Sequence, residues 1–111
     1  MEKQLDSLNQ WIRRNKCEYE GKVLLPLMEC TDGVVIALGV GKDRKSNPRR
    51  NIGESEQFDY TQVEIPFISK NGECLRDSFF DDFEIGRSGM YSYVPVSIVE
   101  NYVNQHGGYV E

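Results

Sequence analysis

The tripeptide Thr31-Asp32-Gly33 is the feature that most restricts how this chain can fold. An Asp-Gly pair accommodates the positive φ angles of a tight turn, and apolar residues lie on both sides of it here. We therefore predict a β-hairpin made of residues 22–30 and 34–40. Pro26 predicts an edge strand or a bulge within the first strand, because proline has no N–H to donate to a sheet. In the second strand, the face with the larger apolar side chains is predicted to pack on the core: Val34, Ile36, Leu38 and Val40.

The rest of the chain predicts further strands and a closing helix. Residues 61–68 alternate apolar and polar side chains, and residues 90–94 are rich in aromatic and β-branched side chains, so both predict strands. Residues 78–85 predict a short helix or turn that inserts phenylalanines into the core. Residues 95–106 predict a helix, with a proline in its first turn and Gly107-Gly108 as its stop. The order predicts an α+β fold: a small antiparallel sheet with an N-terminal and a C-terminal helix.

The N-terminal segment predicts an amphipathic helix over residues 2–16, with one apolar stripe formed by Leu5, Leu8, Trp11 and Ile12. We expect a single domain over residues 1–111, because a chain of this length is too short for two independent cores. Residues 1–20 would hold the amphipathic helix and residues 21–108 the α+β body. The stripe needs a cover, since short isolated helices are marginal in water. Two alternatives remain open, a homodimer interface and docking within the chain.

Charge is distributed unevenly along the sequence. The net charge is -5, yet residues 42–50 hold five basic residues against one acidic residue. Residues 54–84 hold nine acidic residues against two basic ones. An overall acidic protein is repelled by the phosphates of duplex DNA, so we do not expect duplex DNA as a partner.

The basic segment is the strongest candidate for a ligand or partner site. Arginines and lysines on a loop that a proline holds away from the sheet could grip a phosphate or carboxylate. Tyr91 and Tyr93 alternate with Ser92 along one strand and could form a stacking platform beside it. The candidate residues are Arg44, Lys45, Arg49, Arg50, Tyr91 and Tyr93.

Catalytic and metal chemistry are poorly represented. His106 is the only histidine, and the three cysteines (Cys17, Cys30 and Cys74) lack the close spacing of a metal site. We therefore expect that the protein has no enzymatic activity and binds neither a metal nor a cofactor. An odd cysteine count without a signal-peptide pattern predicts a cytoplasmic protein with no structural disulfide, and no apolar run is long enough for a membrane helix. The acidic cluster is expected to form the outward face of a segment whose phenylalanines point inward: Asp77, Asp81, Asp82 and Glu84.

Five short motifs occur in a fixed order: Cys30-Thr31-Asp32-Gly33, Pro48-Arg49, Val63-Glu64-Ile65-Pro66-Phe67, Tyr91-Ser92-Tyr93-Val94-Pro95-Val96 and His106-Gly107-Gly108. As a set they resemble a family of short proteins encoded in phages, prophages and mobile elements of gut-type bacteria. The resemblance covers about residues 28–108 and departs before Pro48, where the family tends to carry aromatic or thiol residues and this chain has Lys45-Ser46-Asn47. The family has no established activity, so the resemblance implies a genomic setting and no mechanism.

The function hypothesis that follows is a non-enzymatic accessory protein of a phage or prophage that acts through protein–protein association. Its partner would be a host or phage protein, or a second copy of the chain, and antagonism of a host system fits this setting. A first alternative is a binder of a small anionic ligand such as a nucleotide. A second alternative is an acidic inhibitor or immunity protein of a toxin or nuclease, which rests on the acidic residues 54–84.

Overall fold

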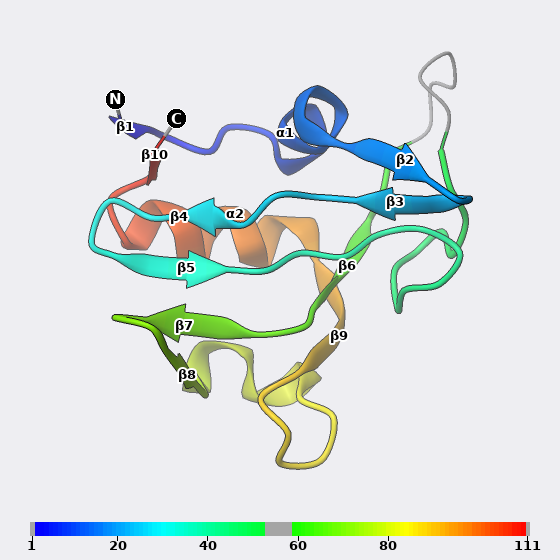
Figure 1. Ribbon diagram of the computed structural model, residues 1–111. Helices are drawn as coiled ribbons and strands as arrows, with labels where there is room; N and C mark the ends of the chain where they lie inside the picture. Colours follow the sequence, from blue (N-terminus) through cyan, green and yellow to red (C-terminus); the bar gives the residue numbers. More distant parts are fainter. Residues whose placement is uncertain (1, 53–58, 111) are drawn as a thin grey trace.

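The computed structural model describes residues 2–52 and 59–110. The predicted α+β class is confirmed, with antiparallel strands and a helix near each end of the chain (Figure 1). Along the chain the elements are β1 (Glu2–Lys3), α1 (Leu8–Asn15), β2 (Cys17–Tyr19), β3 (Lys22–Leu24), β4 (Met28–Glu29), β5 (Val34–Ile36), β6 (Gln62–Ile65), β7 (Ile68–Lys70), β8 (Glu73–Leu75), η1 (Ser78–Phe83), β9 (Tyr91–Pro95), α2 (Val96–Gln105) and β10 (Tyr109–Val110).

The central sheet has four antiparallel strands in the order β4-β5-β7-β8. The predicted turn joins β4 to β5: Gly33 has φ 95° and donates its N–H to the Cys30 carbonyl, and the Asp32 carboxylate accepts the N–H of Val34. Side chains alternate across the sheet as a half-buried sheet requires, with Val34 and Ile36 buried. Figure 1 shows α2 behind β4 and β5, so the buried face of the sheet packs toward this helix.

Two predicted strands are divided in the structure. The first strand of the hairpin stops at Leu24 and resumes at Met28, so Pro26 interrupts it as predicted. Residues 61–68 do not form one strand: β6 pairs with β9, whereas β7 pairs with β5 in the central sheet. Pro66 lies at the point where the chain passes from one sheet to the other, which suits a residue without an N–H.

Residues 17–20, expected in the N-terminal helical part, instead belong to a separate hairpin. β2 pairs with β3, and Glu20 (φ 51°) and Gly21 (φ 78°) form the tight turn between them. Two consecutive positive φ angles match the right-handed twist of the strands in such a hairpin. The pair Glu-Gly is a weaker turn signal than Asn-Gly or Asp-Gly, which is why the sequence pattern did not predict this hairpin.

The first helix is shorter than predicted. It begins at Leu8 and not at residue 2, because Ser7 caps it: the Ser7 hydroxyl accepts the Gln10 N–H at 3.2 Å. Before it, β1 pairs with β10, with Glu2 opposite Val110 in the register.

The apolar stripe of the N-terminal segment lies inside the fold. Leu5, Leu8, Trp11 and Ile12 are all at most 5% exposed. Backbone contacts fix the segment to α2, since the Leu5 N–H donates to the Asn104 side chain at 2.7 Å and the Leu8 N–H donates to the Glu100 carboxylate at 2.8 Å. The N-terminal segment therefore docks within the chain, and its four apolar side chains are not on the surface to form a dimer interface.

The C-terminal helix matches its prediction. α2 spans Val96–Gln105, with Pro95 and His106 as its caps. Its buried side is formed by Val99, Tyr102 and Val103. None of the helices in residues 2–52 and 59–110 combines the length and the apolar content needed to cross a membrane.

Gly108 lies beside β1, just before the strand that pairs with it. It has φ 87°, and a Cβ at this position would overlap the carbonyl of Lys3 in β1. Gly72, in the turn between β7 and β8, has a similar φ of 81° with no atom near its virtual Cβ.

We expect Gly108→Ala to lower the free energy of unfolding by about 3 kcal/mol, because it adds a backbone overlap to the cost of a positive φ. Gly72→Ala is the matched control, and it should cost only about 1 kcal/mol for the φ angle. Urea unfolding followed by circular dichroism measures both variants. Equal losses would show that the contact between Gly108 and Lys3 contributes nothing.

Candidate functional site

The predicted basic segment forms a loop that is held by a buried carboxylate. Glu64 is only 5% exposed, although it is a charged residue that alternates with apolar ones in its strand. One of its carboxylate oxygens accepts from the Arg44 guanidinium and the other from the Lys45 backbone N–H, each at 3.1 Å. Ser46 is also buried, and its hydroxyl accepts the Gly41 N–H at 3.1 Å. Arg44 therefore neutralises an acid of the same chain, which leaves it less available for a ligand.

The structure brings only part of the predicted anion site together. The Tyr93 N–H donates to the Lys45 carbonyl at 3.0 Å, so the loop and this strand are neighbours. Tyr93 is 38% exposed, and Arg49 and Arg50 are exposed. The prediction that Tyr91 and Tyr93 form a shared stacking platform is wrong. Tyr91 is fully buried, and its hydroxyl accepts the N–H of Asp77 at 3.0 Å. Tyr93 has φ 53°, which breaks the strand alternation on which that prediction relied.

We expect Glu64→Ala to lower the free energy of unfolding by about 2 kcal/mol, since it leaves the Lys45 N–H and the Arg44 guanidinium without their acceptor. Glu73→Ala, on an exposed position of β8, is the control and should change stability by about 0.5 kcal/mol or less. Urea unfolding measures both. A loss at Glu64 no larger than at Glu73 would contradict an anchoring role for this carboxylate.

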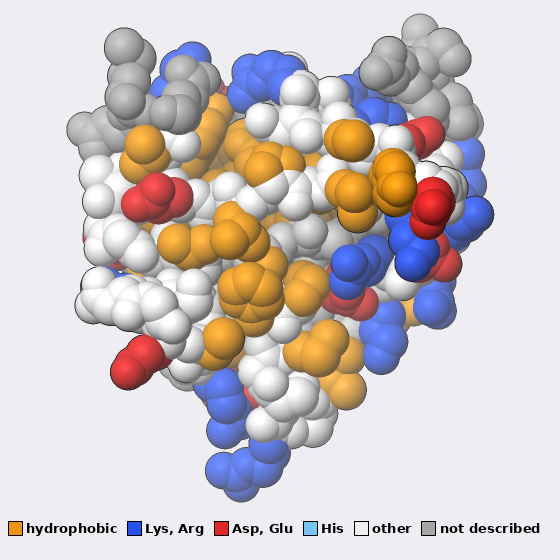
Figure 2. All heavy atoms as spheres, in the orientation of Figure 1, with side chains coloured by type: hydrophobic (Ala, Val, Ile, Leu, Met, Phe, Trp, Pro, Cys, Tyr) orange, Lys and Arg blue, Asp and Glu red, His pale blue; other side chains and the backbone are white. Residues whose placement is uncertain are grey.

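Within the described ranges, no helix covers one face of the central sheet. Val35 and Phe67 are half-buried and, unlike their neighbours Ile36 and Ile68, are not part of the buried core. Leu27, just before β4, is 57% exposed. Figure 2 shows hydrophobic side chains gathered across this side of the molecule, over the region of β3, β4, β5 and β7. Lys and Arg side chains border the apolar area along its right and lower edges in that view.

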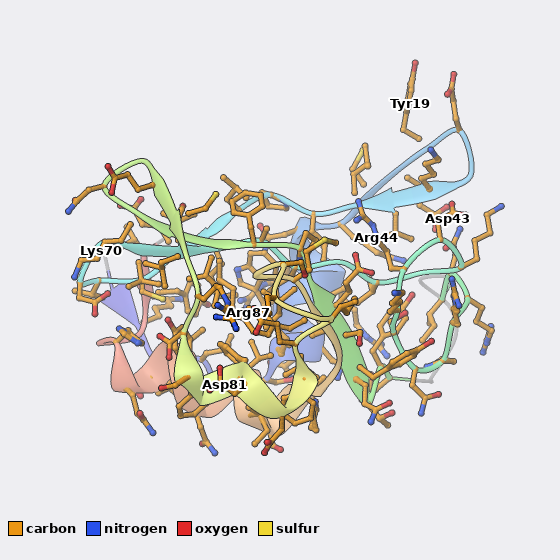
Figure 3. The ribbon with its side chains drawn as sticks, turned by 90° about the horizontal axis from the view of Figure 1, so that it is seen from below. Tyr19, Asp43, Arg44, Lys70, Asp81 and Arg87 are labelled. Atoms are coloured by element: carbon orange, nitrogen blue, oxygen red, sulfur yellow. The ribbon has the colours of Figure 1, made fainter. Side chains whose placement is uncertain are left out.

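The hairpin of β2 and β3 extends the same surface. Its register puts Tyr19 and Leu24 on one side, opposite the buried Val23, and they are 64% and 45% exposed. Figure 3 shows Tyr19 pointing away from the body on the side of the sheet opposite to α2. We call Tyr19, Leu24, Leu27, Val35 and Phe67 the open face.

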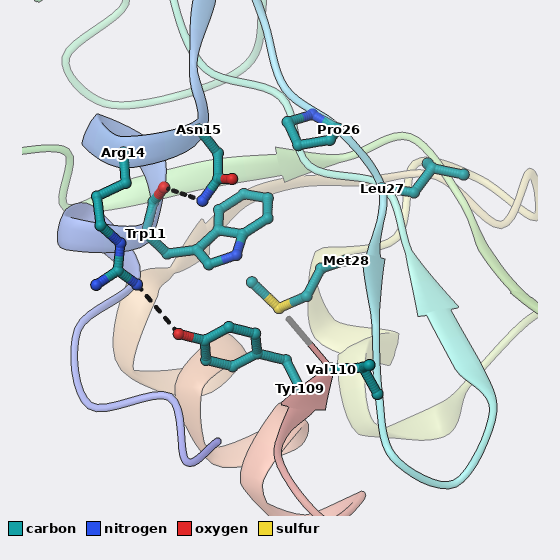
Figure 4. Close-up of a pocket in the computed structure, with 8 residues that line it drawn as sticks. All are labelled: Trp11, Arg14, Asn15, Pro26, Leu27, Met28, Tyr109 and Val110. Atoms are coloured by element: carbon teal, nitrogen blue, oxygen red, sulfur yellow. Dashed lines mark hydrogen bonds between the residues drawn. The ribbon is translucent and has the colours of Figure 1, made fainter. Parts of the chain in front are cut away.

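A hollow of about 450 Å³ lies at one border of the open face (Figure 4). Pro26, Leu27, Met28 and Val110 form apolar walls, and the rings of Trp11 and Tyr109 complete the lining. Two polar side chains of α1 also line the hollow. The Arg14 guanidinium donates to the Tyr109 hydroxyl at 3.1 Å, and the Asn15 amide donates to the Trp11 carbonyl at 2.8 Å.

The sequence interpretation did not select the residues of this hollow, but it contained a signal. Residues 23–28 are six consecutive apolar residues. A strand with one buried face cannot bury them all, so some must lie on the surface. Only Val23 and Met28 at the two ends of this stretch are buried.

The thiol and imidazole groups are arranged for packing and pairing. Burial, together with the charges of Asp32 and Glu29, raises the pKa of the Cys30 thiol to about 11. His106 pairs through Nδ1 with Asp32. Partial burial opposes ionisation of Asp32, but its hydrogen bonds with His106 and with the Val34 N–H hold its pKa below the usual range. A protonated, buried Cys30 does not suit a thiolate nucleophile.

Two of the four acidic residues, Asp77 and Glu84, have structural partners, and the Glu84 side chain is only 6% exposed and so does not point outward as expected. The Asp77 carboxylate caps η1 through the Phe79 N–H and accepts from the Tyr102 hydroxyl at 2.9 Å. Glu84 binds Arg76 through two hydrogen bonds of 2.6 and 2.7 Å, and this pairing holds the pKa of Glu84 below its usual range. Across the part of the chain that the structure describes, no three His, Cys, Asp or Glu side chains are grouped to hold a metal ion.

All three cysteines are free thiols, with Cys17 and Cys74 exposed and Cys30 buried. We expect iodoacetamide at pH 8 to modify two thiols of the folded chain, because a pKa raised to about 11 keeps Cys30 protonated at that pH and burial shields it. The third thiol should react once urea unfolds the chain. Mass spectrometry counts the adducts, and rapid modification of all three thiols in the folded state would be the opposite result.

Comparison with protein-family models, with curated proteins and with solved structures finds no match for this chain. The chemistry of its surface therefore carries the functional argument.

Proposed function

We propose that this chain is a non-enzymatic binding protein that acts through protein–protein association, with the open face as its binding surface. The observation that carries the proposal is the central sheet, which α2 covers on one side. On the other side Val35 lies beside Glu29 and Ser69, and the apolar side chains of Leu27 and Phe67 extend this surface at the ends of the strands. An antiparallel sheet with one solvated face normally alternates apolar and polar residues, so that its outer face is polar. Extended apolar surface bordered by polar residues is typical of interaction sites.

The energetics favour a protein partner for this surface. Burying a large apolar side chain contributes about 1.5–3 kcal/mol, and aromatic residues such as Tyr19 and Phe67 contribute most at interfaces. The Lys and Arg side chains that border the open face favour a partner with acidic residues at matching positions. The resemblance to phage and prophage proteins fits a host protein as that partner. Three free thiols fit a reducing compartment, and the cytoplasm is the compartment we propose.

The alternative of a small anionic ligand held by the basic loop has less support. Arg44 is engaged by Glu64, and Tyr91 is in the core. The alternative of an acidic inhibitor also loses support among the described residues, because Glu64 is buried and Asp77 and Glu84 have partners of their own. Glu54 and Glu56, which belong to the same acidic block, lie outside the described residues.

Photo-crosslinking from defined positions tests the proposal in the cell that produces the protein. We expect benzoylphenylalanine at position 27, on the open face, to give a discrete cross-linked adduct. The same group at position 101, an exposed position of α2 on the other side of the sheet, should not. An equal adduct pattern at both positions, or none at position 27, would overturn the proposed surface.

The identified partner then allows a quantitative test with purified proteins. We expect Leu27→Asp to weaken binding by about a hundredfold, because it buries a charge in an apolar interface. Asn101→Asp is the matched control and should bind like the natural chain. Circular dichroism confirms folding of both variants. If the partner is a second copy of this chain, sedimentation velocity of the same variants gives the measurement.

A further inference from the structure

We propose that the hollow beside the open face binds a carboxylate of the partner protein, at a point where an apolar partner side chain packs between Trp11 and Leu27. This inference rests on the proposed function and names the chemistry of the partner segment: an aliphatic residue with a free carboxylate, as at the C-terminus of a protein. The juxtaposition of an indole N–H, a guanidinium and apolar walls carries it.

The first observation is the indole nitrogen of Trp11. The residue is 95% buried, since only 5% of it is exposed, and the structure contains no acceptor for its N–H among residues 2–52 and 59–110. The indole N–H is nevertheless not sealed in the core, because the described chain has no buried side-chain nitrogen without a partner. Figure 4 shows this nitrogen facing the space beside Met28. A buried aromatic ring with its donor directed into a hollow is arranged to meet an acceptor from outside.

The second observation is the charge at the rim. In α1, Arg13 pairs with Asp59, but no carboxylate of the described residues pairs with Arg14. Its guanidinium is instead oriented by the bond to the Tyr109 hydroxyl at 3.1 Å, which uses one of its five N–H donors. Among the described residues that line the hollow, none is Asp or Glu. The N–H groups of Trp11 and Arg14 that have no acceptor among the described residues favour an anionic ligand. A guanidinium matches the two oxygens of a carboxylate.

The third observation is the apolar wall. Pro26, Met28 and Val110 surround the two donors, so the group that carries the carboxylate must be apolar. Leu27 belongs both to the hollow and to the open face, and a single extended segment can therefore occupy the two surfaces. A strongly hydrated anion such as free phosphate would leave these walls uncovered.

The indole N–H resonance of Trp11 reports binding directly, because Trp11 is the only tryptophan of the chain. We expect N-acetyl-L-leucine to shift this resonance saturably in nuclear magnetic resonance titrations. N-acetyl-L-leucinamide has the same side chain without the charge, and it should bind about tenfold more weakly. Arg14→Met should remove this preference for the acid, whereas Arg13→Met, one residue earlier in the same helix, should keep it. No saturable shift, or equal affinity for acid and amide, overturns the inference.

A peptide tests whether the ligand is a protein segment. A pentapeptide of four alanines and a C-terminal leucine with a free carboxylate should bind about tenfold more tightly than N-acetyl-L-leucine, and shift the backbone resonance of Leu27. No gain in affinity over N-acetyl-L-leucine overturns the protein segment as occupant. If cross-linking at position 27 succeeds while the leucine acid does not bind, this inference fails and the proposed function stands. If the acid and peptide bind but position 27 gives no adduct, the proposed function is the one that fails.

Discussion

Helix α2 is the element on which the rest of the structure depends. Its buried side chains Val99, Tyr102 and Val103 are covered by the central sheet, and α1 is fixed to the helix through Glu100 and Asn104. Because a single helix of ten residues supplies this cover, it can cover only one side of a four-stranded sheet. Because α2 is short, the other side of the sheet stays uncovered. The apolar residues of the open face can therefore contact other molecules.

The sequence predicted correctly those parts of the fold that depend on the backbone preferences of neighbouring residues. The Asp32-Gly33 turn, the interruption at Pro26 and the helix from Pro95 to His106 each depend on a backbone preference of one or two residues, and each is confirmed. The predictions were wrong where contacts between residues far apart in the sequence determine the structure. Periodicity extended the first helix to residue 2, although pairing with β10 makes the start of the chain a strand. Alternation predicted one strand over residues 61–68, although β6 pairs with β9 and β7 pairs with β5.

The candidate site was harder to predict than the fold, for a related reason. Trp11, Met28 and Tyr109 come from α1, β4 and β10, and no spacing in the sequence relates them. Trp11 was recognised as part of an apolar stripe, but the stripe pattern does not say that its N–H finds no acceptor in the part of the chain that the structure describes. The basic loop, in contrast, was conspicuous in sequence because its charges are contiguous, and its most buried arginine serves the fold.

The pairing of β1 with β10 has a consequence for how the chain acquires its structure during synthesis. Glu2 lies opposite Val110, and the core that buries Leu5 and Leu8 includes Val99, Tyr102 and Tyr109. The N-terminal part of this fold therefore cannot complete its packing until residues 99–110 have been made. Contacts of such large sequence separation slow folding and leave apolar segments exposed for longer. Until residue 110 has been made, the apolar side chains of Leu5 and Leu8 stay exposed in the nascent chain.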